Sequence, residues 1–301
     1  MSKVYVFTAF GGPENEELHD RPVPEPGAGE LLVEVRAAGV NPADRKTRDG
    51  TFGTKRALPA GLGLEVAGVV AAVGDGVEGF ALGDPVVAGV GIGRGGLAEH
   101  AVVRAADAVR KPDEVSYTDA ATLPVAGTTA YDLVHQVELE PGGTVLVLGA
   151  GGGVGLMAAQ VARARGHRVI GVASEAKREL VESAGAVHVP SGEGFAGRVR
   201  EVAAAGVDLV IDLVGGEALR AAAPLAREPG RVLSAADGSV REFGGELRRT
   251  TSAALARIVE LVRDGLVDPH VTVTYPLERA GEALAAVETG HAAGKVVVTV
   301  A

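Results

Sequence analysis

Five of the seven residues from 149 to 155 are glycine, in the order Gly-Ala-Gly-Gly-Gly-Val-Gly. Small residues let the backbone turn sharply and approach a diphosphate closely, and the N–H groups at the start of a following helix attract negative charge. Gly155 would let that helix pack against the preceding strand. We therefore expect a dinucleotide to bind at this turn, on Ala150, Gly151, Gly152, Gly153, Val154 and Gly155.

A second group of polar residues follows at the distance that distinguishes NAD from NADP. NAD enzymes place an acidic residue about 20 residues after the motif, where it binds the ribose 2′-hydroxyl. Nineteen residues after Gly155 stands Ser174, followed by Lys177 and Arg178. A hydroxyl and two cations suit the 2′-phosphate of NADPH, so we expect NADPH. Glu175 is adjacent to Ser174, which leaves NADH as the alternative.

The residues around the glycine cluster predict the elements that position it. Val145–Leu148 is a short apolar run typical of a buried strand, and Val154–Arg165 has the three- and four-residue spacing of a helix. Strands and helices continue to alternate after it. This alternation indicates a doubly wound parallel sheet, the Rossmann architecture. The further expected elements are strands at 168–173, 207–214 and 231–235 and helices at 175–184 and 251–263.

The first third of the chain has a different pattern. Short apolar runs at Val4–Phe7, Leu31–Val35 and Val66–Val73 are separated by turns rich in glycine and proline. Such runs indicate a barrel-like, β-rich unit. The chain is expected to end with a helix at 277–287 and a strand at 295–301.

The composition excludes several classes of function. The formal net charge of −10 repels nucleic acid and anionic membranes. The absence of Cys excludes a disulfide framework, a catalytic thiol and a Cys-based zinc site, and it fits a cytoplasmic location. No signal peptide is visible, and glycines interrupt the uncharged stretch 144–162, so we expect no membrane span. The seven His residues, His291 among them, lack a close-spaced ligand pattern.

Five segments carry a resemblance to a known family. They read Ala-Gly-Val-Asn-Pro-Ala-Asp at 38–44, Gly-Leu-Glu-Val-Ala-Gly at 63–68, Ala-Ala-Thr-Leu-Pro at 120–124 with Gly-Thr-Thr-Ala at 127–130, the glycine cluster at 149–155, and Gly-Lys-Val-Val at 294–297. Together they resemble the medium-chain dehydrogenase/reductase superfamily, in its zinc-free quinone oxidoreductase (zeta-crystallin-like) branch. The resemblance covers nearly the whole chain.

The resemblance implies an α/β protein of two domains. A GroES-like, β-rich catalytic domain is expected at residues 1–123, a Rossmann NADPH-binding domain at 124–264, and a C-terminal return to the catalytic domain at 265–301. It also implies that nicotinamide and substrate share the cleft between the domains, and that the protein forms a homodimer. Zinc-dependent relatives carry Cys where this chain has Asn41 and His where it has Leu64, so we expect no metal.

The same resemblance implies further site residues. Asn41 is expected to donate its amide to the acceptor or the cofactor, with a turn as its alternative role, and Asp44 to orient its neighbours or to cap a helix. Phe52 stands in the pocket where many relatives carry Tyr. Because Phe cannot donate a proton, the pocket has no certain proton donor. The residues expected near the nicotinamide, with a structural role as the alternative, are Thr129, Val214, Ala235 and Ala236.

The absence of a metal ligand set limits the acceptor. With no Lewis acid to stabilise an alkoxide, the acceptor must already be electrophilic. A quinone or an α,β-unsaturated carbonyl fits, and catalysis is then mainly positioning. We therefore expect a zinc-independent, NADPH-dependent reductase of such a small molecule. The alternatives are an enoyl thioester reductase, which Phe52 disfavours, and a non-catalytic NADPH-binding regulator.

Overall fold

The structure is a computed structural model that describes residues 1–290 and 292–301, and the chain forms two compact units. One unit contains residues 1–125 and 271–301, and the other contains residues 126–270. The first is rich in antiparallel strands and the second is built on a parallel sheet, as the predicted fold class requires. The domain boundaries expected after residues 123 and 264 stay predictions.

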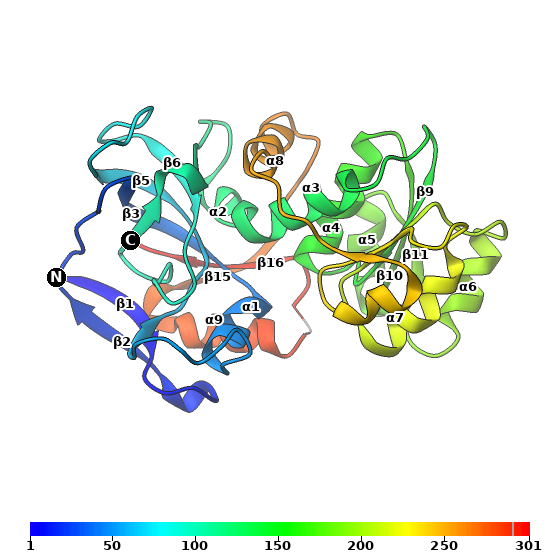
Figure 1. The fold of residues 1–301 in the computed structure, drawn as a ribbon, viewed down its shortest axis with the longest axis horizontal. Helices are drawn as coiled ribbons and strands as arrows, with labels where there is room; N and C mark the ends of the chain where they lie inside the picture. The colour runs from blue at the N-terminus through cyan, green and yellow to red at the C-terminus, as the bar shows by residue number, and fades with distance from the viewer. Residues whose placement is uncertain (291) are drawn as a thin grey trace. The chain divides into compact units, whose positions relative to one another are not determined.

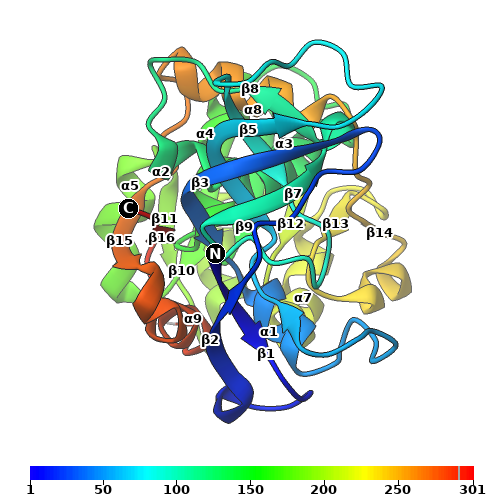
Figure 2. The same ribbon diagram turned by 90° about the vertical axis from the view of Figure 1, so that its left-hand side faces the viewer.

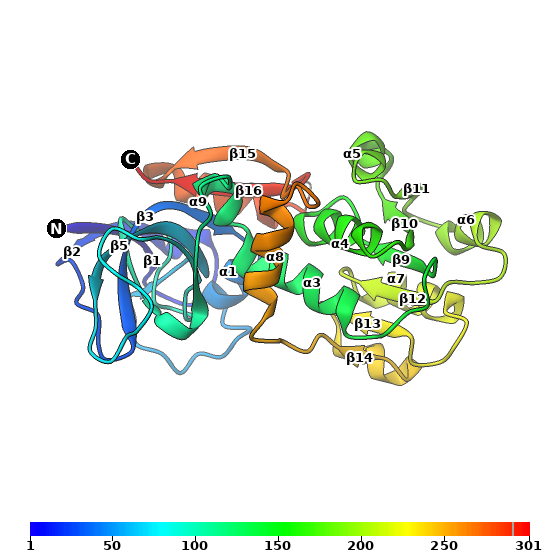
Figure 3. The ribbon, with the colours of Figure 1, turned by 90° about the horizontal axis from the view of Figure 1, so that it is seen from above.

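Six parallel strands form the centre of the unit 126–270 (Figure 3). Their spatial order is β11-β10-β9-β12-β13-β14, so the chain first moves outward from β9 and then returns to its other side at β12. Such a reversal creates a crevice at the carboxyl ends of the two central strands. The strands are β9 (Thr144–Leu148), β10 (Arg168–Ala173), β11 (Val187–Pro190), β12 (Leu209–Asp212), β13 (Val232–Ser234) and β14 (Glu246–Leu247).

Helices cover this sheet (Figure 1). Phe195 of α6 and Leu219 of α7 belong to the same buried core as Leu146 and Ile170 of the sheet. The helix predicted at 175–184 begins as a 3-10 turn, Glu175–Lys177, and only then becomes α5. The helices are α3 (Thr128–His135), α4 (Gly153–Ala164), α5 (Arg178–Ser183), α6 (Phe195–Val202), α7 (Gly216–Ala222) and α8 (Ala254–Arg263).

The other unit contains two sheets (Figure 2). A small sheet has the order β2-β1-β4, and a larger sheet has the order β15-β16-β3-β5-β6-β8, with β7 also pairing with β3. The long strand β3 pairs with β16, so the last strand of the chain joins the N-terminal residues. The strands are β1 (Ser2–Phe7), β2 (Glu16–Arg21), β3 (Glu30–Val40), β4 (Ala60–Gly61), β5 (Glu65–Val73), β6 (Pro85–Gly89), β7 (His100–Arg104), β8 (Ala108–Arg110), β15 (Val271–Pro276) and β16 (Lys295–Thr299).

The α-helices that accompany these sheets in the described residues are α1 (Pro42–Arg48), α2 (Tyr117–Ala120) and α9 (Ala280–Glu288). Alternate residues of β3, namely Leu31, Val33 and Val35, lie in a core that also includes Ala283 and Leu284 of α9. These three residues follow the two-residue period of a strand, although Leu32 and Ala37 of β3 are buried as well. In the described parts of the chain, every helix is too short or too polar to cross a bilayer.

Candidate active site

The glycine cluster forms a tight turn between β9 and α4. Gly149 has a left-handed φ of +77°, which favours glycine. The N–H groups of Gly149 and Ala150 donate to the Val172 carbonyl of β10, at 3.0 and 3.1 Å. A Cβ on Gly155 would lie 2.4 Å from the Gly149 carbonyl oxygen, so only glycine permits this contact between helix and turn. Gly155 thus lets the first turn of α4 lie against the glycine turn itself.

The start of α4 places a partial positive charge at this turn. Its N-cap is Gly152, which has no side chain to cap the helix. The first N–H groups of a helix lack intrahelical acceptors and lie at the positive end of its dipole. They follow the carboxyl end of β9, beside the point where the strand order reverses. An anionic group could therefore bind at Gly153 and Val154.

The Lys177 side chain lies across the turn. A Cβ on Gly151 would be 2.5 Å from Lys177 Cδ and 3.0 Å from Lys177 Cβ, so the lysine stem occupies the space that glycine leaves. Lys177 is half-buried, and this burial lowers the pKa of its ammonium group. The structure thus brings the cation predicted for the 2′-phosphate to the predicted diphosphate turn.

The other predicted phosphate ligands are arranged differently. Ser174 is exposed at the end of β10. Arg178 forms a two-point ion pair with Glu175, from Nε at 2.7 Å and from Nη2 at 3.0 Å. The hydrogen bond from Arg178 lowers the pKa of Glu175. The acid that could have selected NAD is therefore bound to a neighbouring cation.

Two buried residues that the sequence analysis missed hold the loops after β12 and β13. Asp212 Oδ1 accepts the N–H of Val214 at 3.0 Å. Ser234 Oγ donates to Asp212 Oδ2 at 2.6 Å and accepts the N–H of Ala236 at 3.0 Å. Val214, Ala235 and Ala236 are exposed at the carboxyl edge of the sheet, with their backbones held in place. A polar residue at the end of each apolar strand was the signal that could have identified this pair.

A second missed network surrounds Thr129. Arg248 Nη1 donates to Thr129 Oγ1 at 2.7 Å, and its Nη2 donates to Thr128 Oγ1 at 2.9 Å. The same guanidinium pairs with the buried Asp132 at 2.7 Å. Arg248 directly follows β14, so it joins the edge of the sheet to α3. Thr129 is thus held from outside its own helix.

In the other unit, Asn41 belongs to a buried charge network. Lys295 Nζ donates to Asn41 Oδ1 at 2.7 Å, to Glu65 Oε1 at 3.0 Å and to the Val40 carbonyl at 3.1 Å. Asn41 Nδ2 donates to the same Glu65 oxygen at 2.7 Å, and Glu65 Oε2 accepts the N–H of Val125 at 2.7 Å. Asn41 therefore uses both ends of its amide inside the unit.

Asp44 and Phe52 are in contrasting environments. The Asp44 carboxylate accepts the N–H of Asn41 at 2.8 Å and that of Gly63 at 3.1 Å, so it closes the first turn of α1. Its complete burial raises the pKa of Asp44 to about 7 despite these bonds. Phe52 follows α1 in a loop and is 44% exposed. The helix-capping alternative thus describes the contacts of Asp44, while the Phe52 ring is accessible.

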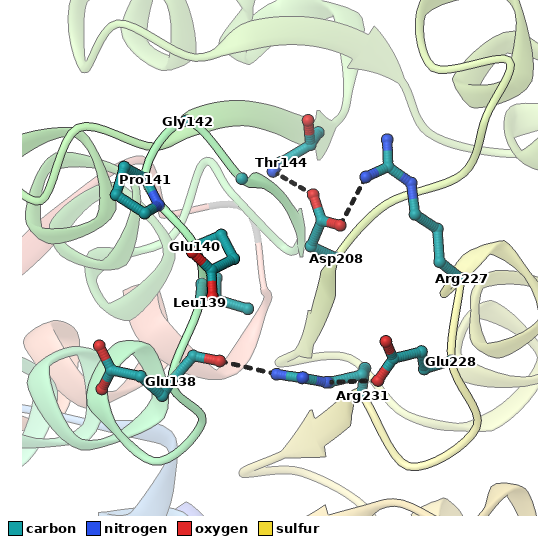
Figure 4. Close-up of a pocket in the computed structure, with 11 residues that line it drawn as sticks. Glu138, Leu139, Glu140, Pro141, Gly142, Thr144, Asp208, Arg227, Glu228 and Arg231 are labelled. Atoms are coloured by element: carbon teal, nitrogen blue, oxygen red, sulfur yellow. Dashed lines mark hydrogen bonds and ion pairs between the residues drawn. The ribbon is translucent and has the colours of Figure 1, made fainter.

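A pocket of about 390 Å³ opens at the amino ends of the parallel strands, opposite to the glycine turn (Figure 4). Thr144 lies at the beginning of β9, and Asp208 and Arg231 directly precede β12 and β13. Arg231 Nε donates to Glu228 at 3.1 Å, and Asp208 accepts from Arg227 at 2.6 Å. Ligands of parallel sheets bind at the carboxyl ends of the strands. We therefore place the candidate site at the glycine turn and not in this pocket.

Residues 1–290 and 292–301 contain no cluster of three or more His, Asp or Glu side chains that could hold a metal ion. His167 and His188 are buried within the unit 126–270. His291 lies outside the described residues.

Comparisons with known proteins agree with this architecture. Residues 27–113 match the alcohol dehydrogenase GroES-like domain, and residues 184–298 match the family described as zinc-binding dehydrogenase. Human quinone oxidoreductase is 32% identical to this chain over 306 residues, which cover 94% of this chain and 92% of the human protein. The chain belongs to the quinone oxidoreductases of the medium-chain dehydrogenase/reductase superfamily. This confirms the resemblance found in its sequence.

Solved structures extend the comparison of this oxidoreductase. The Escherichia coli quinone oxidoreductase complexed with NADPH has a TM-score of 0.89 and 27% identity, with 99% of both chains covered. An NAD-dependent alcohol dehydrogenase has the same TM-score and 33% identity, with 99% of this chain and 100% of the other covered. The GroES-like and Rossmann fold class is confirmed. Proteins named for either coenzyme share this fold, so the fold alone does not determine the coenzyme.

Proposed function

We propose that this oxidoreductase uses NADPH to reduce a quinone or an α,β-unsaturated carbonyl compound without a metal ion. The observation that carries the proposal is the glycine turn of residues 149–155 with the Lys177 side chain across it. The proposal includes a cytoplasmic homodimer, which the family resemblance and the Cys-free composition favour.

The coenzyme is held by groups at the carboxyl edge of the parallel sheet. The first turn of α4 binds the diphosphate through backbone N–H groups. Lys177 and Ser174 bind the 2′-phosphate, because one offers a positive charge and the other a hydroxyl. Glu175 does not oppose that phosphate strongly, since Arg178 neutralises its carboxylate. NADPH supplies a hydride from C4 of its nicotinamide ring.

The loops after β12 and β13 orient the nicotinamide. Asp212 and Ser234 fix the backbones at Val214 and Ala236, so these loops lose little entropy when a ring is bound against them. Thr129 is positioned by Arg248 in the same way. The contribution of these residues to the rate is therefore orientation of the reacting carbon.

The residues at the usual metal position favour a reaction without zinc. The Lys295 ammonium is bound to both Asn41 and Glu65, so a positive charge is already present among the available oxygen ligands. A divalent ion there would be repelled at short range. Leu64 offers no donor atom. An acceptor that stabilises its own developing negative charge removes the need for a Lewis acid, and the proton comes from solvent.

The test is the loss of NADPH absorbance with a panel of quinones and enones, including 1,4-naphthoquinone. We expect turnover with at least one compound, and unchanged turnover after dialysis against a strong chelator. Activity that disappears on chelation and returns with zinc would contradict the metal-free part. No NADPH oxidation with any member of the panel, by a protein that binds NADPH, would contradict the reaction itself.

A further inference from the structure

The segment 45–56 is basic in a chain whose net charge is −10. Two of its cations are neutralised within the unit: Arg48 pairs with Glu288 at 2.7 Å, and Arg45 with Asp49 at 3.6 Å. Asp49 is the one acidic residue of the segment. The charged residues of the segment are Arg45, Lys46, Arg48, Asp49, Lys55 and Arg56. The loop that carries Phe52 therefore has a local positive charge.

Arg56, in this loop, has buried N–H donors without a hydrogen-bond acceptor among the described residues. Its Nη2 donates to the carbonyls of Phe52 and Gly53 at 3.5 and 3.4 Å, near the outer limit for a hydrogen bond. Its Nε and Nη1 are buried and have no partner within the described residues. Nearby Arg94, by contrast, pairs with Glu30 at 2.7 Å. Buried charged donors normally have acceptors. Because the described residues provide none for Nε and Nη1, a bound ligand is a candidate partner of the guanidinium.

The surroundings of Arg56 suit an organic anion with an apolar body. Its Nη1 would be 3.2 Å from a Cβ on Gly93, so the guanidinium rests against a backbone with no side chain. Three large apolar residues are exposed in the loop that follows α1 and in the loop that contains Gly93. They are Phe52 at 44%, Leu58 at 39% and Ile92 at 50%. Exposed apolar side chains in the same loops as a cation without an acidic partner are a combination suited to a small amphiphilic ligand.

We propose that Arg56 binds a carboxylate on the acceptor, so that the substrate class is an anionic enone or quinone. This inference rests on the proposed function and specifies its substrate. Arg56 is partly exposed, and its two long bonds to carbonyls are weak enough for a carboxylate to replace them. A carboxylate that replaces the two carbonyls at Nη2 would accept charge-assisted hydrogen bonds from the guanidinium, and these are stronger than bonds between neutral groups.

The test compares 4-oxopent-2-enoate with its methyl ester, which has the same enone without the charge. In both, the hydride adds to one alkene carbon and a solvent proton to the other, giving the saturated ketone and NADP⁺. The measured quantity is the ratio of kcat/KM for the acid to kcat/KM for the ester. We expect Arg56→Gln to lower this ratio about tenfold, since charge-assisted hydrogen bonds are lost. Arg56→Lys, which keeps the charge, should give an intermediate ratio.

Lys55→Gln is the matched control, because it removes the same charge from the neighbouring exposed residue. We expect its ratio to equal that of the wild type. An unchanged ratio in Arg56→Gln, or an equal fall in both variants, would overturn the anion site. Turnover of the ester by Arg56→Gln verifies that the variant is folded and active.

Binding of the saturated 4-oxopentanoate, measured by calorimetry, separates this inference from the proposed reaction. Affinity that falls about tenfold in Arg56→Gln supports the anion site even without turnover. If the wild type then reduces neither the acid nor the ester nor 1,4-naphthoquinone, the proposed reaction fails and the anion site stands. If the ester is reduced normally and neither ratio nor affinity depends on Arg56, the anion site alone fails.

Discussion

Lys177 and Glu175 are expected to have opposite effects on the choice of coenzyme. The lysine lies over Gly151, where it can meet a phosphate, while the glutamate next to Ser174 carries the charge that a phosphate avoids. Arg178 is bound to that glutamate and is therefore only partly available to a ligand. The proposed preference for NADPH depends on the balance of these three charges.

We predict that Lys177→Gln lowers the NADPH preference and that Glu175→Gln raises it. The measurement is kcat/KM for NADPH divided by kcat/KM for NADH, with one quinone as the acceptor. Removing the lysine should reduce the ratio about tenfold, because a charged contact to the 2′-phosphate is lost. Removing the glutamate charge should increase it several-fold, because Arg178 becomes free to bind the phosphate. Equal changes with NADH and NADPH in both variants would contradict this assignment.

Residues that act locally were predicted from the sequence, and residues that act through distant partners were not. The glycine turn and Ser174 were predicted because their spacing along the chain is itself the signal. Asp132 was not, because its partner Arg248 is 116 positions away. Asn41 was expected to donate its amide to a ligand, yet in the structure both ends of that amide contact Glu65 and Lys295, and Lys295 is 254 positions away. Such pairings depend on tertiary structure that no local pattern contains.

Helix α4 depends on Gly155 for its approach to the glycine turn. A methyl group there would meet the backbone of Gly149 and Ala150 at 2.4 and 2.6 Å, and backbone atoms cannot rotate away as a flexible side chain would. We predict that Gly155→Ala lowers the free energy of unfolding by about 1–3 kcal/mol, as expected for overpacking. The same variant should weaken NADPH binding, since the helix start moves. Chemical denaturation and calorimetry measure the two effects.

Gly197 in α6 provides the control for this prediction. It is exposed, and a Cβ there would meet no atom within 4 Å. Gly197→Ala should therefore stabilise the protein by about 0.5–1 kcal/mol, because alanine has the higher helix propensity. If both substitutions stabilised the protein, the close contact at Gly155 would not determine the position of α4.

The centres of the elements were predicted better than their ends. β10 occupies residues 168–173 as expected, because its apolar run is bounded clearly. The helix expected from Thr251 begins only at Ala254. Thr251 Oγ1 instead donates to Asp132 at 2.6 Å, a tertiary contact that holds the residue outside the helix. Apolar periodicity identifies the body of an element, whereas tertiary hydrogen bonds determine where it stops.

At the scale of the molecule, the last strand belongs to the unit of residues 1–125 and 271–301. β16 pairs with β3, and Lys295 at its start carries the ammonium that contacts Asn41 and Glu65. Periodicity predicted a strand at the C-terminus but not its partner. The return was expected only from the resemblance to a family, which supplies the pairing that a single sequence lacks.

The central claim is that the turn after Leu148 binds the diphosphate of a nicotinamide coenzyme. Isothermal titration calorimetry of the folded chain with NADPH, and separately with NADH, tests it most directly. We predict one saturable site per chain, tighter for NADPH than for NADH, with affinity reduced in Gly155→Ala and unchanged in Gly197→Ala. Saturable binding of neither coenzyme to a protein with intact secondary structure would contradict the account.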